Sequence, residues 1–162
     1  MSAGTAFIKI SAEQICIANA IVSGSTNRIK NSELTTEYAV HLPNGARLSR
    51  SAVLMDSQLR DLIFSGAIDP NFEAYLSLNH NISLQVRGWL PGDRFKPMGA
   101  PGSKKLKDWF IDRQIPKMER NQLPVVTIAE SKIVWVPGLP PAEESRISKQ
   151  TIQALRLTYQ TA

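Results

Sequence analysis

The sequence predicts an α+β fold, made mostly of antiparallel β-hairpins in a meander, with a few short helices packed on the sheet. Short runs of alternating or β-branched residues recur along the chain and are separated by Pro, Gly and Asn turns. Helical spacing is confined to brief segments. The 162 residues are 43% hydrophobic and 20% charged, which is enough to bury the core of one ordinary domain or two small ones.

The N-terminal part of the chain differs from the rest. Residues 1–33 are predicted to form a short helical segment that ends a preceding helical region, and residues 34–162 an α+β domain. Apolar residues recur at helical spacing over 11–22, with Ser11 as the expected N-cap. Cys16 lies inside this helix and is interpreted as a packing residue. As the only cysteine in the chain it excludes an internal disulfide.

The next segment has the pattern of a hairpin. Residues 34–55 are expected to form this hairpin, with strand formers nearly alternating before Pro43-Asn44-Gly45 and apolar residues continuing after it. Asn-Gly tolerates the positive φ that such a turn needs. Residues 57–68 remain ambiguous, because their apolar residues fit a helical face that stops at Gly66 but are too few to decide.

The second half of the chain is also rich in strand-forming residues. A polar turn at 79–81 and a second turn at Glu130-Ser131 separate the expected strands, and 148–153 is expected to form one helical turn. The later strands are expected at 72–78, 82–90, 123–129, 132–136 and 154–159.

A helix is predicted from Ser103 as N-cap through Arg113. Leu106, Trp109 and Phe110 fall on one narrow stripe of this helix and are interpreted as core rather than as base-stacking residues, with the stem of Arg113 at the edge of the stripe. Pro116 is expected to open a second short helix that Pro124 closes.

The basic excess of the chain is concentrated in one segment. The chain has 19 Lys and Arg against 14 Asp and Glu, for a net charge of +5 and a pI near 9.6. Nine basic and four acidic residues lie between Arg87 and Arg120, so this segment carries the whole excess and the rest is neutral. Such clustering indicates a surface for phosphates. The alternative is a solvated face that is basic by chance.

The position of three lysines supports the phosphate interpretation. Lys104, Lys105 and Lys107 are expected in the first turn of the predicted helix, where cations oppose the helix dipole. Backbone N–H groups at a helix start together with lysines form a phosphate site. Basic groups that come from a strand end, a loop and two helix starts suit a nucleic-acid backbone better than a small-ligand pocket.

Other function classes have no support in the sequence. There is no Walker A motif, no G-x-G-x-x-G and no Ser-His-Asp or Cys-His arrangement, so no catalytic residue is assigned. His41 is expected on a solvated strand and His80 in a turn, and two histidines with one cysteine do not make a zinc site. No membrane span or signal peptide is recognised, and the expected compartment is the cytoplasm.

The same basic segment carries a resemblance to a known family. The motif runs Arg87-Gly-Trp-Leu-Pro-Gly-Asp93-Arg94-Phe-Lys-Pro97-Met-Gly99, then Ser103-Lys-Lys-Leu-Lys-Asp-Trp-Phe-Ile-Asp112-Arg-Gln-Ile-Pro116, followed by Arg120 and Pro124-Val-Val. Together with Ile133-Val-Trp-Val-Pro-Gly138, it resembles the C-terminal domain of bacterial tRNA(Ile)-lysidine synthetase. The resemblance is specific over 82–159 and looser over 11–78.

The resemblance implies a function. Enzymes of that family use ATP, with Mg, to join lysine to the wobble cytidine of the isoleucine tRNA that carries a CAU anticodon. Their chemistry belongs to an N-terminal PP-loop domain with a Ser-Gly-Gly-x-Asp-Ser motif, which Ser23-Gly24-Ser25 does not match. The chain is therefore expected to lack catalysis and to need no cofactor of its own. It would act with the PP-loop domain as an accessory domain that grips tRNA on the acceptor-stem side.

The resemblance also assigns site residues. The basic positions expected to contact tRNA are Arg87, Arg94, Lys104, Lys105, Lys107, Arg113, Lys117 and Arg120. The positions expected to shape the site are Gly92, Asp93, Gly99, Ser103, Asp112 and Pro116, and Asp93 is expected to orient Arg94 or Arg87.

Two alternatives to this assignment stay open. One is a module for dimerisation or interdomain packing, and the other is a stand-alone RNA-binding protein. A homodimer would be formed through an edge of the β-rich meander.

Overall fold

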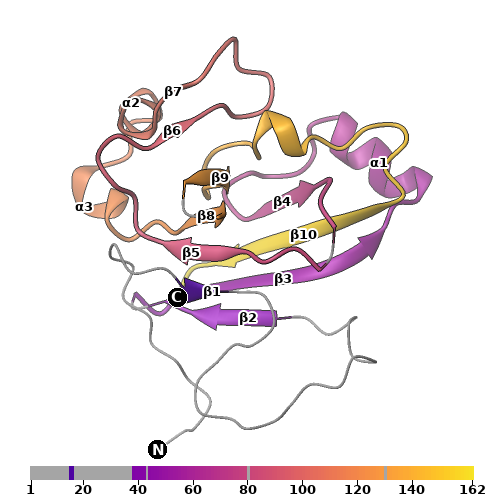
Figure 1. Cartoon of the computed structure of the whole chain (residues 1–162), viewed down its shortest axis with the longest axis horizontal. Helices are drawn as coiled ribbons and strands as arrows, with labels where there is room; N and C mark the ends of the chain where they lie inside the picture. Colours follow the sequence, from indigo (N-terminus) through magenta and orange to yellow (C-terminus); the bar gives the residue numbers. More distant parts are fainter. Residues whose placement is uncertain (1–14, 17–37, 43, 80, 130) are drawn as a thin grey trace, which may run out of the picture.

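The structure is a computed structural model that describes residues 15–16, 38–42, 44–79, 81–129 and 131–162. Two four-stranded sheets and one two-stranded sheet account for the strands in this part of the chain. They are accompanied by three short α-helices and a 3-10 turn (Figure 1). The expected α+β class with antiparallel pairing is confirmed.

The first sheet has the order β2-β3-β10-β4. Its long central strands, β3 (Arg47–Leu54) and β10 (Gln153–Gln160), pair antiparallel over their full length. The hairpin expected over 34–55 is present, with β2 (Tyr38–His41) beside β3. At its turn Gly45 has φ +83 and donates its N–H to the carbonyl of Leu42 at 2.9 Å. The final expected strand is β10.

The second sheet has the order β1-β5-β8-β9. The hairpin expected across 130–131 is present as β8 (Val125–Ile128) and β9 (Lys132–Trp135), with a register shift at Val126. β5 (Gln85–Arg87) pairs with β8 and is shorter than the strand predicted over 82–90.

One expectation from the sequence is corrected by this sheet. Ile15–Cys16 form β1, a short strand paired with β5, so the helix predicted over 11–22 is wrong at these two residues. The rest of that helix lies outside the described residues. The expected strand at 72–78 is present as β4 (Glu73–Leu76), which joins the first sheet, whereas β5 joins the second.

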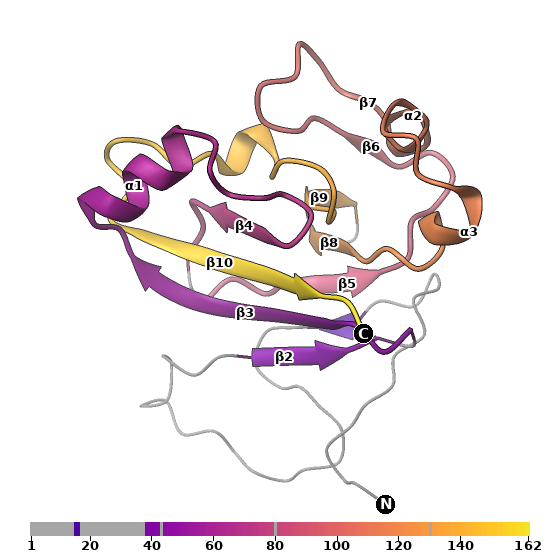
Figure 2. The same ribbon diagram turned by 180° about the vertical axis from the view of Figure 1, so that it is seen from behind.

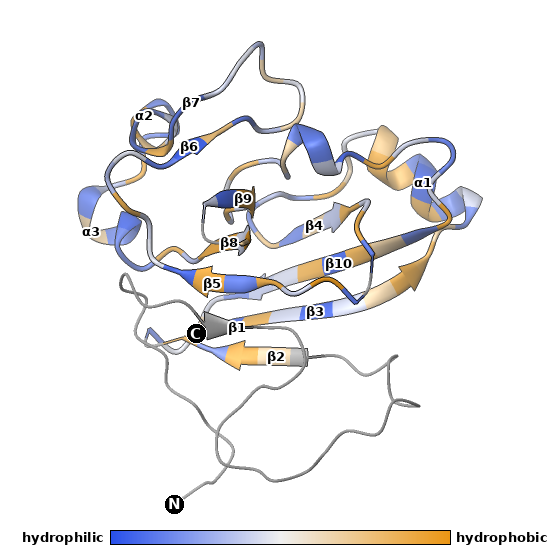
Figure 3. Ribbon diagram, viewed as in Figure 1, coloured by the Kyte–Doolittle hydropathy of each residue, from blue (hydrophilic) through white to orange (hydrophobic). Residues whose placement is uncertain are grey.

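The main core lies between the two sheets. Figures 2 and 3 show the long strands β3 and β10 side by side. Leu48 and Leu157 of these strands are fully buried, whereas their neighbours Arg47 and Arg156 are half-buried. Trp135 is fully buried here and donates its indole N–H to the Leu139 carbonyl at 3.1 Å. The buried members of this core are Val40, Leu42, Ala46, Leu48, Ala74, Leu76, Leu84, Val86, Val126, Val134, Trp135, Leu155, Leu157 and Tyr159.

A second core covers the other face of the second sheet. Leu106 and Phe110 of α2 (Leu106–Asp112) are fully buried there against Val125 and Val136. The stripe predicted for this helix therefore packs against the sheet as expected. The layers are the first sheet, the second sheet, and then α2 with the small sheet β6-β7 (Figure 1).

The ambiguous segment is a helix. α1 (Ser57–Phe64) begins after Asp56, whose carboxylate accepts the amide of Leu59 at 2.7 Å. None of its residues is buried, which is the physical reason for its weak sequence pattern. The helical turn expected over 148–153 is wrong: Glu143–Ser145 form the 3-10 turn instead, and Thr151 stabilises the following loop by accepting the amide of Ser148 at 2.9 Å.

Candidate nucleic-acid interface

Four consecutive elements form one end of the molecule. They are β6 (Arg94–Phe95), β7 (Lys104–Lys105), α2 and α3 (Lys117–Arg120). Figure 1 shows all four together and far from α1, so the basic segment of the sequence folds back on itself rather than spreading over the molecule. β7 and α3 are largely hydrophilic in Figure 3.

The small sheet places two cations opposite each other. β6 and β7 are antiparallel, with Arg94 facing Lys105 and Phe95 facing Lys104. Cross-strand partners point to the same side of a sheet, so the exposed side chains of Arg94 and Lys105 are neighbours, while Phe95 is buried on the other side. The guanidinium of Arg94 donates to the carbonyl of Ser103 at 3.0 Å, which holds it beside β7.

The start of α2 differs from the sequence prediction. Lys104 and Lys105 belong to a strand, the helix begins at Leu106, and Lys105 is the N-cap residue without a side-chain cap. The prediction of Ser103 as N-cap and of lysines 104 and 105 in the first helical turn is therefore wrong. Pairing with β6 overrides the helix propensity of the two lysines, because tertiary contacts outweigh such a weak local preference.

Lys104 is engaged within the molecule. Its ammonium lies 3.9 Å from the centre of the Trp109 ring and forms an ion pair with Asp112. Trp109 is itself held by a hydrogen bond from its indole N–H to the carbonyl of Phe95 at 2.9 Å. Lys104 thus links β7 to α2, and Asp112 is its ion-pair partner at the end of the helix.

Three further cations on or beside the helices are exposed: Lys107, Arg113 and Lys117. With Arg94 and Lys105 they make up what we call the cationic end. Arg120 is half-buried and donates its Nε to the carbonyl of Ile115 at 2.7 Å, which fastens α3 to the preceding loop. Pro116 is the N-cap residue of α3, as its expected helix-opening role requires, although the helix ends at Arg120, before Pro124.

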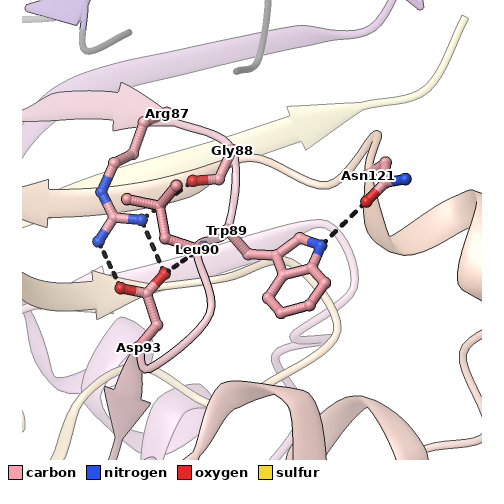
Figure 4. A network of polar contacts seen from close by, with 6 residues as sticks. All are labelled: Arg87, Gly88, Trp89, Leu90, Asp93 and Asn121. Carbon is pink, nitrogen blue, oxygen red and sulfur yellow. Dashed lines mark hydrogen bonds and ion pairs between the residues drawn. The ribbon is translucent and has the colours of Figure 1, made fainter. Parts of the chain in front are cut away.

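Arg87 is the clearest correction among the expected tRNA contacts. Its side chain is 1% exposed, and its two terminal nitrogens donate to the two carboxylate oxygens of Asp93 at 2.7 and 2.8 Å (Figure 4). A buried, bidentate pair leaves no charge for a surface phosphate, so the prediction that Arg87 contacts RNA is wrong. The expectation that Asp93 orients an arginine agrees with this geometry.

Two of the predicted shaping glycines occupy turns. Gly92 has φ +93 in a turn closed by the Asp93 amide and the Leu90 carbonyl at 3.1 Å. Gly99 has φ +82 in a turn closed by the Ala100 amide and the Pro97 carbonyl at 3.0 Å. Both are third residues of type II turns, the position that favours glycine.

Sequence reasoning missed one contact. The indole N–H of Trp89 donates to the side-chain oxygen of Asn121 at 3.1 Å, and its ring meets Phe110 edge to face with centroids 5.9 Å apart. This joins the loop after β5 to the end of α3 (Figure 4). Trp89 stands in the quoted motif, but nothing in the sequence pairs it with a residue 32 positions away.

The described residues contain neither a metal-binding cluster of His, Cys, Asp and Glu nor a helix able to span a membrane. No group of three or more His, Cys, Asp and Glu in this part of the chain is arranged to hold a metal ion. None of the helices found there is long and apolar enough to cross a bilayer.

Comparison with known proteins identifies the family. The crystal structure of a TilS C-terminal domain superposes with a TM-score of 0.59 and 30% identity, and the match covers 76% of this chain and 89% of that one. The chain belongs to the TilS C-terminal domain family. The family described as "TilS substrate C-terminal domain" matches residues 84–157. These residues include the cationic end.

Curated relatives extend this assignment. The tRNA(Ile)-lysidine synthase of Caldanaerobacter subterraneus is 46% identical over 76 residues, which are 47% of this chain and 16% of that protein. The enzyme of the same name from Oceanobacillus iheyensis is 35% identical over 120 residues, which are 74% of this chain and 24% of that protein. The chain thus spans between 12% and 24% of the length of such relatives.

A more distant structure shares the fold alone. The N-terminal fragment of the phenylalanyl-tRNA synthetase β-subunit from Pyrococcus horikoshii superposes with a TM-score of 0.50 at 11% identity. That match covers 70% of this chain and 39% of the fragment.

Proposed function

We propose that this chain is the tRNA-binding accessory domain of a tRNA(Ile)-lysidine synthase, and that it holds the acceptor-stem side of the tRNA through the cationic end. Family membership and the names of the relatives support tRNA as the partner. The function is positional: a domain elsewhere in the enzyme carries out the chemistry while this one orients the substrate. Such a role would be carried out in the cytoplasm.

The finer proposal concerns the reaction. The parent enzyme would ligate lysine to the wobble cytidine of the isoleucine tRNA with a CAU anticodon, using ATP and Mg in its PP-loop domain. Because this chemistry is assigned to the PP-loop domain, no step of the ligation is assigned to the described residues of this chain.

The observation that carries the proposal is the pairing of Arg94 with Lys105. Like charges directly opposite each other in an antiparallel pair destabilise it. A phosphate near both side chains removes this repulsion and gains charge-assisted hydrogen bonds. The same end of the molecule also carries the exposed cations Lys107, Arg113 and Lys117. They add further contacts for the phosphates of an RNA backbone.

The form of the surface suits an RNA stem. An A-form helix hides its base edges in a deep, narrow groove and displays phosphates and 2′-hydroxyls, so proteins recognise it mainly by shape and backbone. The cations of this end lie on or beside four short elements. We therefore expect binding that is strongly salt-dependent and that contacts few bases.

The test is a titration of fluorescein-labelled tRNA with the chain at several salt concentrations. The double variant Lys105→Ala/Lys107→Ala should weaken binding and lower the slope of log K against log salt by about 0.7–0.9 for each phosphate that the variant no longer neutralises. The control is Lys149→Ala, which removes an exposed lysine near the α1 end of the molecule. Unchanged affinity in the double variant contradicts the proposal.

One observation favours the alternative of a packing module. Met118 is 82% exposed and Ile111 is 49% exposed, so apolar side chains accompany the cations on α2 and α3. Under this alternative, Met118→Ser/Ile111→Ser would weaken association with a neighbouring domain or a second copy. The lysine variants would then change tRNA affinity little. Sedimentation of the variant and of the unmodified chain separates the two functions.

A further inference from the structure

We propose that the buried Arg87–Asp93 pair is a positioning element that makes the cationic end select a rigid A-form stem over a flexible polyanion. This inference rests on the proposed function and concerns how the same surface chooses its RNA. It assigns to Arg87 a role that does not use contact with the RNA.

The pair is held in place by further hydrogen bonds inside the molecule. Besides its two bonds to Asp93, Arg87 donates to the carbonyl of Gly88 at 3.0 Å. The Asp93 carboxylate also accepts the amide of Leu90 at 2.7 Å. These bonds close the turn at 90–93 and attach Asp93 to the end of β5, as Figure 4 shows.

Asp93 connects this turn to the elements that carry the cations. Its backbone carbonyl accepts the amide of Leu106, the first residue of α2, at 2.8 Å. The next residue is Arg94, which begins β6 and pairs with Lys105. A shift of Asp93 would therefore move Arg94 and the start of α2 together.

Trp89 connects the same loop to α3. It lies in the loop that the Arg87–Asp93 pair closes, and its indole N–H donates to Asn121, the residue that ends α3. Its ring packs against Phe110 of α2 with an interplanar angle of 87°. The loop thus contacts both helices that carry exposed cations.

Fixed spacing affects rigid and flexible ligands differently. The phosphates of a duplex have set positions, so cations that are displaced no longer meet them. A single strand adapts its backbone to wherever the cations lie, and its binding depends on their number rather than on their geometry. Loss of the Arg87–Asp93 geometry should therefore cost duplex affinity while it spares single-strand affinity.

The experiment compares an RNA duplex with a single-stranded oligouridylate of the same phosphate count. Arg87→Lys keeps the charge but loses the bidentate fork. We expect the ratio of single-strand to duplex dissociation constants to fall by about tenfold, which corresponds to one charge-assisted hydrogen bond between the protein and the duplex. The matched control is Arg156→Lys, which alters an ion pair with Glu73 on the first sheet and should leave the ratio unchanged.

The outcomes separate this inference from the proposed function. Circular dichroism first establishes that each variant is folded at the temperature of the titration. An unchanged ratio in folded Arg87→Lys, or an equal loss for both RNAs, overturns the inference and leaves the proposed function standing. If the unmodified chain binds neither RNA, the proposed function fails and the inference with it. If Arg87→Lys does not fold, Trp89→Phe removes the Asn121 bond while it keeps an aromatic ring beside Phe110, and it must lower the same ratio.

Discussion

The ammonium of Lys104 lies over the ring of Trp109 and is paired with Asp112 at the other end of α2. This one side chain therefore ties β7 to the helix that follows it. Because Lys104 is engaged in these contacts, we expect it to contribute less to phosphate binding than Lys105, its exposed neighbour in the sequence.

Replacing Lys104 should affect stability more than RNA binding. Lys104→Met removes a cation–π contact and an exposed ion pair, for a decrease of about 0.5–1 kcal/mol in the free energy of unfolding. Urea denaturation measures this decrease. The salt dependence of tRNA binding should stay close to that of the unmodified chain, and a slope as low as that of Lys105→Ala would show that Lys104 contacts phosphate.

Removing a carboxylate from the cationic end should strengthen RNA binding. Asp112→Asn releases Lys104 and takes a negative charge away from the surface, so affinity for tRNA should rise by roughly two- to fivefold at low salt. The control is Asp61→Asn, an exposed position on α1. Equal effects of the two substitutions would mean that only net charge matters.

The second core, on which α2 packs, should contribute strongly to the stability of the domain. Phe110 is fully buried between α2 and the second sheet, and Phe110→Ala should cost about 3–5 kcal/mol by cavity formation and reduced burial. Phe64→Ala, at a half-exposed position on α1, should cost far less. Thermal unfolding of both variants checks this, and a small effect of Phe110→Ala would place α2 off the core.

Backbone conformation should make Gly92 sensitive to substitution. Its φ of +93 disfavours any side chain although no atom lies within 4 Å of the added Cβ. Gly92→Ala should therefore lose about 1–2 kcal/mol of stability by backbone strain alone. Gly102 has equally open surroundings without a positive φ, so Gly102→Ala is the matched control and should be nearly neutral.

Tyr75 should make the first sheet sensitive to alkaline pH. Burial and the hydrogen bond to Glu73 raise the pKa of Tyr75 from 10.0 to about 12. Because the folded state holds the phenolic proton more tightly, this contribution to stability is complete below pH 10 and is lost as the pH rises towards 12.

The measurement compares denaturation of the unmodified chain and of Tyr75→Phe across that pH range. The variant lacks the titrating group, so its stability should fall less steeply between pH 10 and 12. Parallel curves for the two proteins would show that Tyr75 is not the group responsible.

Local patterns in the sequence were sufficient for most strands. The hairpin at Asn44-Gly45 and the final strand at 153–160 were predictable because alternation and turn residues report local backbone preference. The stripe of Leu106, Trp109 and Phe110 was predictable for the same reason, because its helical spacing indicates which face of α2 packs against the core.

The sequence by itself determined the α+β class, the buried face of α2 and the location of the whole positive excess between Arg87 and Arg120. Only the tertiary structure decided which of those cations are exposed. A sequence gives the formal charge of Arg87 and Lys105 alike, but burial and partners depend on how distant strands pack together. That packing places Arg87 inside with Asp93 and leaves Lys105 exposed beside Arg94.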